Sequence, residues 1–298
     1  MTDNIKISFI CNWGKSSEYF YERASRLTPG NSNRWKNLVA TKDIKEADFI
    51  VALGNFPYSH VDSEYIKANP RKLIHVRTEA SIGDAFSGPW AGFDKSSYNY
   101  DFLKEHRCNV VDMGWVFGDY DSYVSSEYPN KPKDTSIIAS TIWDHRTDYI
   151  KAIQEFTGNS IDLYGRGWES QSDSLIHNYK GQLPKKDDKP MGLKDYKFSV
   201  AIENSAEKNY VTEKLYNCFM EWTIPLYWGC PNISDFYPED SYRLLDLNDP
   251  SQILDVIKEP VSDREKEALR EARHLVLNKH NIWEIVWDII NNKIKTDI

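Results

Sequence analysis

The sequence contains few cysteines, and their spacing suggests neither a disulfide framework nor a metal site. The four are Cys11, Cys108, Cys218 and Cys230, and no two of them have CxxC or zinc-ligand spacing. A chain of 298 residues can bury a sizeable core without disulfide bonds. We therefore expect reduced, buried thiols and a cytoplasmic protein.

Long hydrophobic runs and an excess of positive charge are also absent. No run approaches the roughly 18 apolar residues that cross a membrane, and the first residues do not resemble a secretion signal. The 37 basic residues are outnumbered by 45 acidic ones, so no broad positive field attracts nucleic acid. We expect a chain without a membrane span and without a nucleic-acid partner, with peripheral membrane attachment left open. An anionic ligand would need a local basic pocket.

The remaining composition is that of a globular protein. Apolar residues make up 40% and charged residues 28%, which excludes disordered and low-complexity classes. Aromatic residues reach 13%, more than a core of this size requires. Aromatic rings on surfaces stack on the faces of sugars and bases, so this surplus hints at such a ligand.

Short β-rich segments alternate with helical segments along the chain. Strands are predicted at residues 5–10, 47–53, 72–76, 109–113, 135–139, 160–164, 197–202 and 224–228. Helices are predicted at residues 145–156, from residue 213, and at 263–277 and 282–293. This alternation is typical of βα units with a mainly parallel sheet.

A polar segment with two prolines, residues 119–135, interrupts the alternation and reads as a linker. It divides the chain into residues 1–130 and residues 131–298, the second part including the terminal helices. We expect an α/β protein with two Rossmann-like domains that face each other across a cleft. Ligands of such folds bind beyond the carboxyl ends of the strands.

The most informative segment follows the strand at 197–202. Thr212 is a good N-cap residue, and a helix is expected to begin at Glu213 and Lys214. A cation in the first turn opposes the helix dipole, which makes Lys214 unusual. A diphosphate at this helix N-terminus would remove the conflict, and Glu213 would then suit a ribose diol. The alternative is an ordinary cap with a solvated Lys214.

Three pieces of this region together resemble a known family. They are Glu-Asn-Ser at 203–205, Tyr-Val-Thr-Glu-Lys-Leu at 210–215 and Ile-Pro-Leu-Tyr-Trp-Gly at 224–229. In order and spacing they are similar to the donor-binding signature of glycosyltransferase family ten, the α1,3/α1,4-fucosyltransferases, and to its bacterial branch in particular. The resemblance implies a GT-B fold, GDP-fucose bound by the C-terminal domain and inverting transfer to a sugar hydroxyl. It also implies that the nucleotide is contacted by Asn204, Tyr210, Glu213 and Lys214.

A second cation falls near another expected helix N-terminus. Arg146 follows the strand at 135–139 and is similar in position to the phosphate-binding arginine of the family. Together with Lys214 it could neutralise a leaving diphosphate without a metal ion or another cofactor. The alternative is an exposed arginine that pairs with Asp144 or Asp148. We interpret the segment that contains Lys185, Lys186 and Lys189 as a solvated loop.

Glycosyl transfer also needs a base for the acceptor hydroxyl. Glu79 follows the strand at 72–76 in the N-terminal half and resembles the proposed general base of the family, although its flanking residues depart from the family pattern. The alternative is a strand-end acid without a catalytic role. His75 is expected to be structural, and the triplet Asp119-Tyr120-Asp121 to be a solvated loop rather than a metal-binding motif.

These observations favour an inverting, metal-independent glycosyltransferase that moves fucose from GDP-fucose to an acceptor glycan in an α1,3 linkage. The N-terminal domain would bind the acceptor and the C-terminal domain the nucleotide sugar. A transferase of the same fold with another donor, such as UDP-xylose or another GDP-sugar, is a second possibility. The third is a catalytically inactive protein that binds a glycan or a nucleotide sugar.

Overall fold

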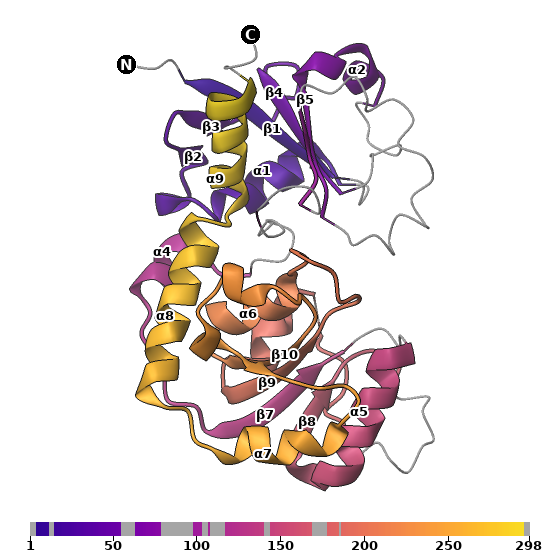
Figure 1. Cartoon of the computed structure of the whole chain (residues 1–298). Coiled ribbons are helices and arrows are strands. Elements are labelled where there is room, and N and C mark those ends of the chain that lie inside the picture. Colours follow the sequence, from indigo (N-terminus) through magenta and orange to yellow (C-terminus); the bar gives the residue numbers. More distant parts are fainter. Residues whose placement is uncertain are drawn as a thin grey trace. The chain divides into compact units, whose positions relative to one another are not determined.

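The computed structural model describes residues 4–11, 15–54, 63–78, 98–102, 107, 117–139, 144–168, 178–184 and 186–294. The chain divides into two compact units, Met1–Ser125 with Val276–Ile298, and Ser126–Leu275. Each unit contains one sheet of mostly parallel strands with helices packed against it (Figure 1). The expected α/β class is confirmed.

The first unit contains a sheet with the strand order β2-β3-β1-β4-β5-β6. Its strands are β1 (Ile5–Cys11), β2 (Arg34–Trp35), β3 (Leu38–Ala40), β4 (Phe49–Leu53), β5 (Leu73–Val76) and β6 (Tyr98–Tyr100). Only the β2–β3 pair is antiparallel among these strands. Its helices include α1 (Ser17–Ser25), α2 (Ser63–Ala68) and α4 (Tyr120–Ser125). The strands predicted at 5–10, 47–53 and 72–76 are thus present, while the one at 109–113 lies outside the described residues.

The second unit contains a parallel sheet with the order β11-β10-β9-β7-β8. Its strands are β7 (Lys133–Ile138), β8 (Ile161–Tyr164), β9 (Tyr196–Ile202), β10 (Ile224–Trp228) and β11 (Arg243–Leu244). Its helices are α5 (Asp144–Thr157), the 3-10 helix η5 (Lys186–Gly192), α6 (Glu213–Met220), α7 (Ile253–Lys258) and most of α8 (Asp263–Asn278). Figure 1 shows α6 on one side of this sheet and α5 with α7 on the other. Every strand predicted for this half is present.

The C-terminal helix belongs to the first unit, although the sequence analysis placed it with the second domain. Helix α9 (Ile282–Asp288) is followed by a π-helical segment, Ile289–Ile294. Trp283 packs edge-on against Phe9 of β1, with ring centroids 5.2 Å apart, and its indole nitrogen donates to the carbonyl of Ala24. The apolar faces of α9 and β1, which lie at opposite ends of the sequence, pack together here. Local periodicity does not reveal such a contact.

The segment 119–135 is partly ordered into α4 and the start of β7, so it is not simply a linker. The Asp119 carboxylate accepts a hydrogen bond from the Ser122 amide at 3.0 Å. The Asp121 carboxylate accepts one from the Gly30 amide at 2.7 Å. Both acids of the Asp-Tyr-Asp triplet therefore fix the backbone of the first unit, and the expectation of a merely solvated loop is wrong.

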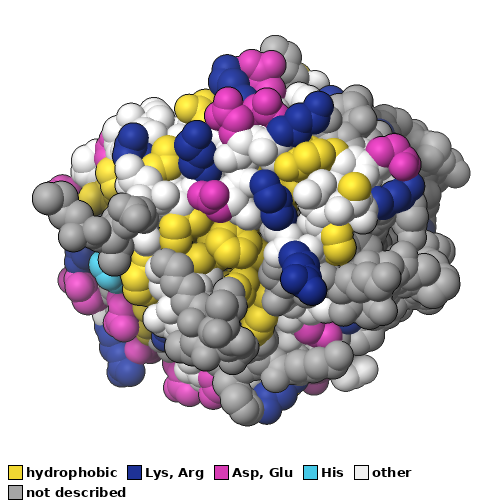
Figure 2. All heavy atoms as spheres, turned by 90° about the horizontal axis from the view of Figure 1, so that it is seen from above, with side chains coloured by type: hydrophobic (Ala, Val, Ile, Leu, Met, Phe, Trp, Pro, Cys, Tyr) yellow, Lys and Arg dark blue, Asp and Glu magenta, His cyan; other side chains and the backbone are white. Residues whose placement is uncertain are grey.

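Three further expectations concern composition. Cys11, Cys218 and Cys230 are buried and not joined in disulfide bonds, whereas Cys108 lies outside the described residues. Among the residues that the structure describes, no helix is long and apolar enough to cross a membrane. The described basic and acidic side chains are interspersed on the face in Figure 2, where hydrophobic side chains gather near the centre.

His75 is a structural histidine, as expected. It lies on β5 with 2% of its surface exposed, and its Nε2 is 2.6 Å from the carbonyl oxygen of Gly54. Because a carbonyl only accepts, Nε2 carries the proton in the neutral ring. Burial lowers the pKa of His75 to about 4, outweighing the opposing effect of the Gly54 carbonyl.

This lowered pKa predicts acid sensitivity. The unfolded chain takes up the proton near the ordinary pKa of about 6.5, so His75 stabilises the fold above that pH and loses its contribution as the pH falls toward 4. We expect a loss of up to about 3 kcal/mol in the free energy of unfolding over this range. Denaturant titrations of His75→Gln should show a flatter pH dependence.

Candidate functional site

The second sheet has one place where its topology opens a crevice. From β7 the chain passes through α5 to β8, the neighbour of β7 on one side. From β9 it passes through α6 to β10, which lies on the opposite side of the β7–β9 pair. Since β7 and β9 are neighbours, their carboxyl ends form the topological switch point at which open α/β sheets bind ligands. The N-terminal turns of α5 and α6 both begin at this edge.

A pocket lies at this switch point. Its apolar wall comes from β7, β9 and the first turns of α5, and includes Ile137, Ile150 and Ile202. Its polar lining is formed by Arg146, Lys189, Ser199, Glu213, Lys214, Asn217 and the thiol of Cys218. The structure thus brings Arg146, Glu213 and Lys214 together, as the sequence predicts.

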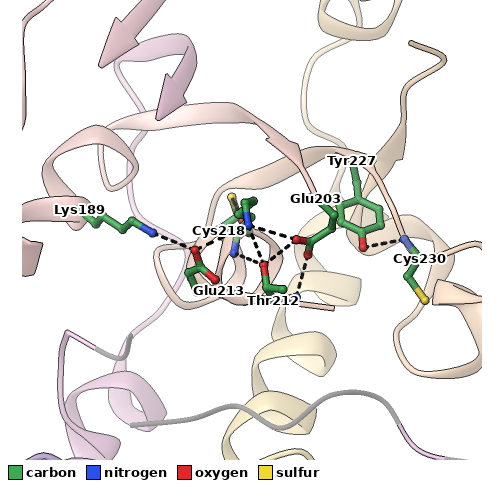
Figure 3. Close-up of polar contacts among 8 residues, drawn as sticks. Lys189, Glu203, Thr212, Glu213, Cys218, Tyr227 and Cys230 are labelled. Carbon is green, nitrogen blue, oxygen red and sulfur yellow. Dashed lines mark hydrogen bonds and ion pairs between the residues drawn. The ribbon is translucent and has the colours of Figure 1, made fainter. Parts of the chain in front are cut away.

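The N-terminus of α6 is held by a buried carboxylate. Glu203, at the end of β9, is fully buried, and its two oxygens accept hydrogen bonds from the amide and the hydroxyl of Thr212, at 2.7 Å and 2.6 Å. Thr212 caps α6 as predicted, because its hydroxyl accepts from the Lys214 amide. Glu203 also lies against Gly229, where a Cβ would come within 2.5 Å of the Glu203 side chain. Figure 3 shows Glu203 and Thr212 facing each other across this turn.

Lys214 is neither solvated nor unpaired. Its side chain is only 18% exposed, and its Nζ lies 3.3 Å from a Glu203 oxygen and 3.8 Å from a Glu213 oxygen. Burial alone would lower the pKa of Lys214, but the carboxylates of Glu213 and Glu203 outweigh burial and raise it. Lys214 therefore remains a cation in the first turn of α6.

Glu213 is shared between two lysines (Figure 3). Lys189, from η5, reaches it at 3.4 Å, and Lys214 approaches from its own helix. Burial would raise the pKa of Glu213, but these two cations lower it to about 2. The expectation that Lys189 belongs to a solvated loop is thus wrong. Glu213 is ionised at neutral pH and can accept hydrogen bonds from the hydroxyls of a sugar.

Arg146 differs from the two lysines because no carboxylate balances it directly. It is 9% exposed, it forms no ion pair with a side chain that the structure describes, and its buried Nε has no hydrogen-bond partner there. Burial lowers the pKa of Arg146, yet a guanidinium remains charged at neutral pH. A buried, unmatched cation is costly unless a ligand supplies the negative charge.

Two predicted nucleotide contacts do not line the pocket. Tyr210 is buried, with 1% of its surface exposed, and Asn204 is partly buried with an Oδ1 that has no hydrogen-bond partner among the described residues. The predicted base, Glu79, lies outside the described residues. Among the described residues, no cluster of three or more histidine, cysteine or acidic side chains could hold a metal ion.

Sequence reasoning missed the roles of Glu203, Lys189 and Asn217. The position of Asn217 was accessible, because it follows Glu213 by four residues and lies on the same helical face. The pairing of Glu203 with Lys214 and the approach of Lys189 from η5 depend on tertiary contacts.

Comparison with known families identifies this unit. Residues 128–269 match the family model "Glycosyltransferase family 10 (fucosyltransferase) C-term". This part of the chain is therefore similar to the C-terminal domain of the family 10 fucosyltransferases. The matched residues run from near the start of the second unit into α8 and include every residue that lines the pocket.

Proteins similar to this chain come from animals and from a bacterium. The chain is 27% identical over 168 residues to alpha-(1,3)-fucosyltransferase B of Drosophila melanogaster, which covers 52% of this chain and 36% of the relative. It is 37% identical over 67 residues to alpha-(1,3)-fucosyltransferase FucT of Helicobacter pylori, covering 22% of this chain and 14% of the relative. The chain thus spans about a third or less of these relatives' length. Animal and bacterial proteins match alike, so the comparisons do not single out the bacterial branch.

Solved structures support the fold. An α1,3-fucosyltransferase with GDP-fucose aligns over 100% of this chain and 92% of its own length, with a TM-score of 0.52 and 15% identity. A DNA-modifying β-glucosyltransferase aligns over 95% of this chain and 98% of its own, with a TM-score of 0.50 and 11% identity. The chain thus has the expected GT-B fold.

The different pairing of Arg146 and Lys214 predicts different phenotypes. Arg146→Met should weaken nucleotide diphosphate binding by about 10- to 100-fold and leave the free energy of unfolding unchanged or higher, because no internal ion pair is lost. Lys214→Met should weaken binding similarly but also cost about 2–3 kcal/mol of stability, because Glu203 keeps a buried charge without its cation. Calorimetric titration and denaturant unfolding measure the two quantities.

A double variant separates the two effects of Lys214. Glu203→Gln combined with Lys214→Met removes both charges, so it should recover part of the stability lost in Lys214→Met without recovering nucleotide affinity. Full recovery of affinity would show that Lys214 serves the fold alone.

Proposed function

We propose that the chain transfers fucose from GDP-fucose to a hydroxyl of an acceptor glycan in an α1,3 linkage, with inversion at the anomeric carbon. The observation that carries this proposal is the buried guanidinium of Arg146, which forms no ion pair with a described side chain, in a pocket of the part of the chain that matches the fucosyltransferase family model. The names of the relatives, α(1,3)-fucosyltransferases, support the donor sugar and the linkage. An experiment that measures GDP release from GDP-fucose, with and without acceptor glycans, tests the reaction.

In the proposed donor complex, the diphosphate lies against Arg146 and Lys214, and the ribose hydroxyls donate to Glu213. Three cations, Arg146, Lys189 and Lys214, face two carboxylates, Glu203 and Glu213, so the pocket has an excess of one positive charge for an anionic ligand. These cations neutralise the charge that develops on the leaving GDP, which is why we propose a reaction without a metal ion.

The acceptor hydroxyl attacks the anomeric carbon from the side opposite to GDP. One C–O bond forms as the bond to the diphosphate oxygen breaks, and GDP leaves with the bonding electron pair. Glu79 takes the proton of the acceptor hydroxyl, which makes the hydroxyl oxygen a better nucleophile in the transition state. The role of Glu79 rests on its position after β5 in the sequence and on the family resemblance.

Nucleotide preference tests the donor. GDP at about one hundred times its dissociation constant should raise the free energy of unfolding by about 2.7 kcal/mol, and UDP at the same concentration should raise it less. Thermal unfolding with each nucleotide measures the difference. Stronger protection by UDP would instead favour a transferase with another donor.

The base is tested by Glu79→Gln. The amide can hydrogen-bond an acceptor hydroxyl but cannot take its proton, so the rate of transfer should fall by about 100- to 10,000-fold while donor affinity changes little. The wild-type rate should rise with pH through one ionisation, and this rise should be absent from the variant. A variant that keeps most of the wild-type chemical rate would place the base on another residue.

A further inference from the structure

Asn217 is a buried amide of the pocket that the proposed reaction does not use. It lies on α6, one turn after Glu213, and only 5% of its surface is exposed. Its side chain lines the pocket, and its buried Nδ2 has no acceptor among the described residues. A buried donor without a partner destabilises a fold relative to an apolar side chain of the same shape.

The neighbouring polar groups of the pocket are already satisfied within the protein. The thiol of Cys218 donates to the carbonyl of Lys214 at 3.1 Å, one helical turn back. The hydroxyl of Ser199 donates to the carbonyl of Ser136 at 3.3 Å and lies 3.1 Å from the Ser136 hydroxyl. Asn217 therefore differs from these neighbours. It resembles Arg146, whose buried Nε also has no hydrogen-bond partner among the residues that the structure describes.

The chemistry of an amide indicates which part of a ligand it would bind. The charges of a diphosphate are met by Arg146 and Lys214, whereas a neutral amide suits a neutral oxygen such as a hydroxyl or a base carbonyl. Asn217 shares a helical face with Glu213, the residue proposed to bind ribose. The apolar wall that includes Ile137 and Ile202 completes a setting suited to a nucleoside.

We propose that Asn217 binds the nucleoside portion of the donor by donating a hydrogen bond from Nδ2 to a neutral oxygen of the ribose or base. This inference rests on the proposed function, since it places the donor nucleotide in this pocket. Asn217 would contact the nucleoside, whereas Arg146 and Lys214 would contact only the phosphates.

The test compares Asn217→Leu with a matched control, Thr135→Val. Thr135 lies on β7 toward its amino end, is 1% exposed, and has a buried hydroxyl without a partner, but it does not line the pocket. Both replacements remove an unsatisfied polar group at nearly constant shape, so both should hold or raise the melting temperature. Only Asn217→Leu should weaken GDP binding, by about 3- to 10-fold in calorimetric titration.

Inorganic pyrophosphate serves as the second probe. Its affinity should be the same in the wild type, Asn217→Leu and Thr135→Val, because Asn217 does not contact the diphosphate. If Asn217→Leu fails to fold, Asn217→Ala provides the same readout. Repeating the titration with 2′-deoxy-GDP separates a ribose contact from a base contact, since a bond to the 2′-hydroxyl would remove the difference between wild type and variant.

The outcomes are distinct. GDP that binds the wild type and Asn217→Leu equally would overturn this inference alone. A loss of pyrophosphate affinity as large as that of GDP would overturn the assignment to the nucleoside. GDP that does not bind the wild type would overturn the proposed function itself.

Discussion

The site depends on the buried carboxylate of Glu203. A carboxylate without solvent costs several kcal/mol unless hydrogen bonds and a cation compensate it, and here Thr212 and Lys214 supply both. Burial raises the pKa of Glu203 and the nearby Lys214 opposes that rise, so the carboxylate and the first turn of α6 stabilise each other. Glu203 fits only because residue 229 is a glycine. The end of β9, the start of α6 and the end of β10 are fixed by one side chain, which orders the pocket before a ligand binds.

The charges of the pocket are divided between structure and binding. Lys189 and Lys214 are held by carboxylates in the structure, whereas Arg146 and Asn217 each have a buried donor with no partner in the described part of the chain. Such groups lower the stability of a protein and persist where they contact a ligand. An anionic, hydroxyl-rich ligand would satisfy all four, which is the chemistry of a nucleotide sugar and agrees with the fucosyltransferase family model that residues 128–269 match.

Helix α9 contributes to the core of the first unit. Trp283 of α9 contacts Phe9, and its neighbour Asn281 caps α9 while donating to the carbonyl of Leu27 at 2.9 Å. The chain therefore passes between the two units twice, at Ser125–Ser126 and within α8, between Leu275 and Val276. Truncating the terminal helix would remove core contacts of the first unit rather than of the second unit.

The sequence by itself determined strands β7 to β10 and helices α5, α6 and α8, the cap at Thr212 and three pocket residues, Arg146, Glu213 and Lys214, because these follow from local periodicity, capping chemistry and spacing along the chain. It did not predict β11, α7 or η5. It did not determine that Lys189 approaches Glu213, that Glu203 holds Lys214, or that α9 joins the first unit. Those contacts join residues from different elements, and their partners are selected by burial and charge compensation in the folded chain. Only the tertiary structure decided them, because a local sequence pattern carries no information about which distant side chain meets it.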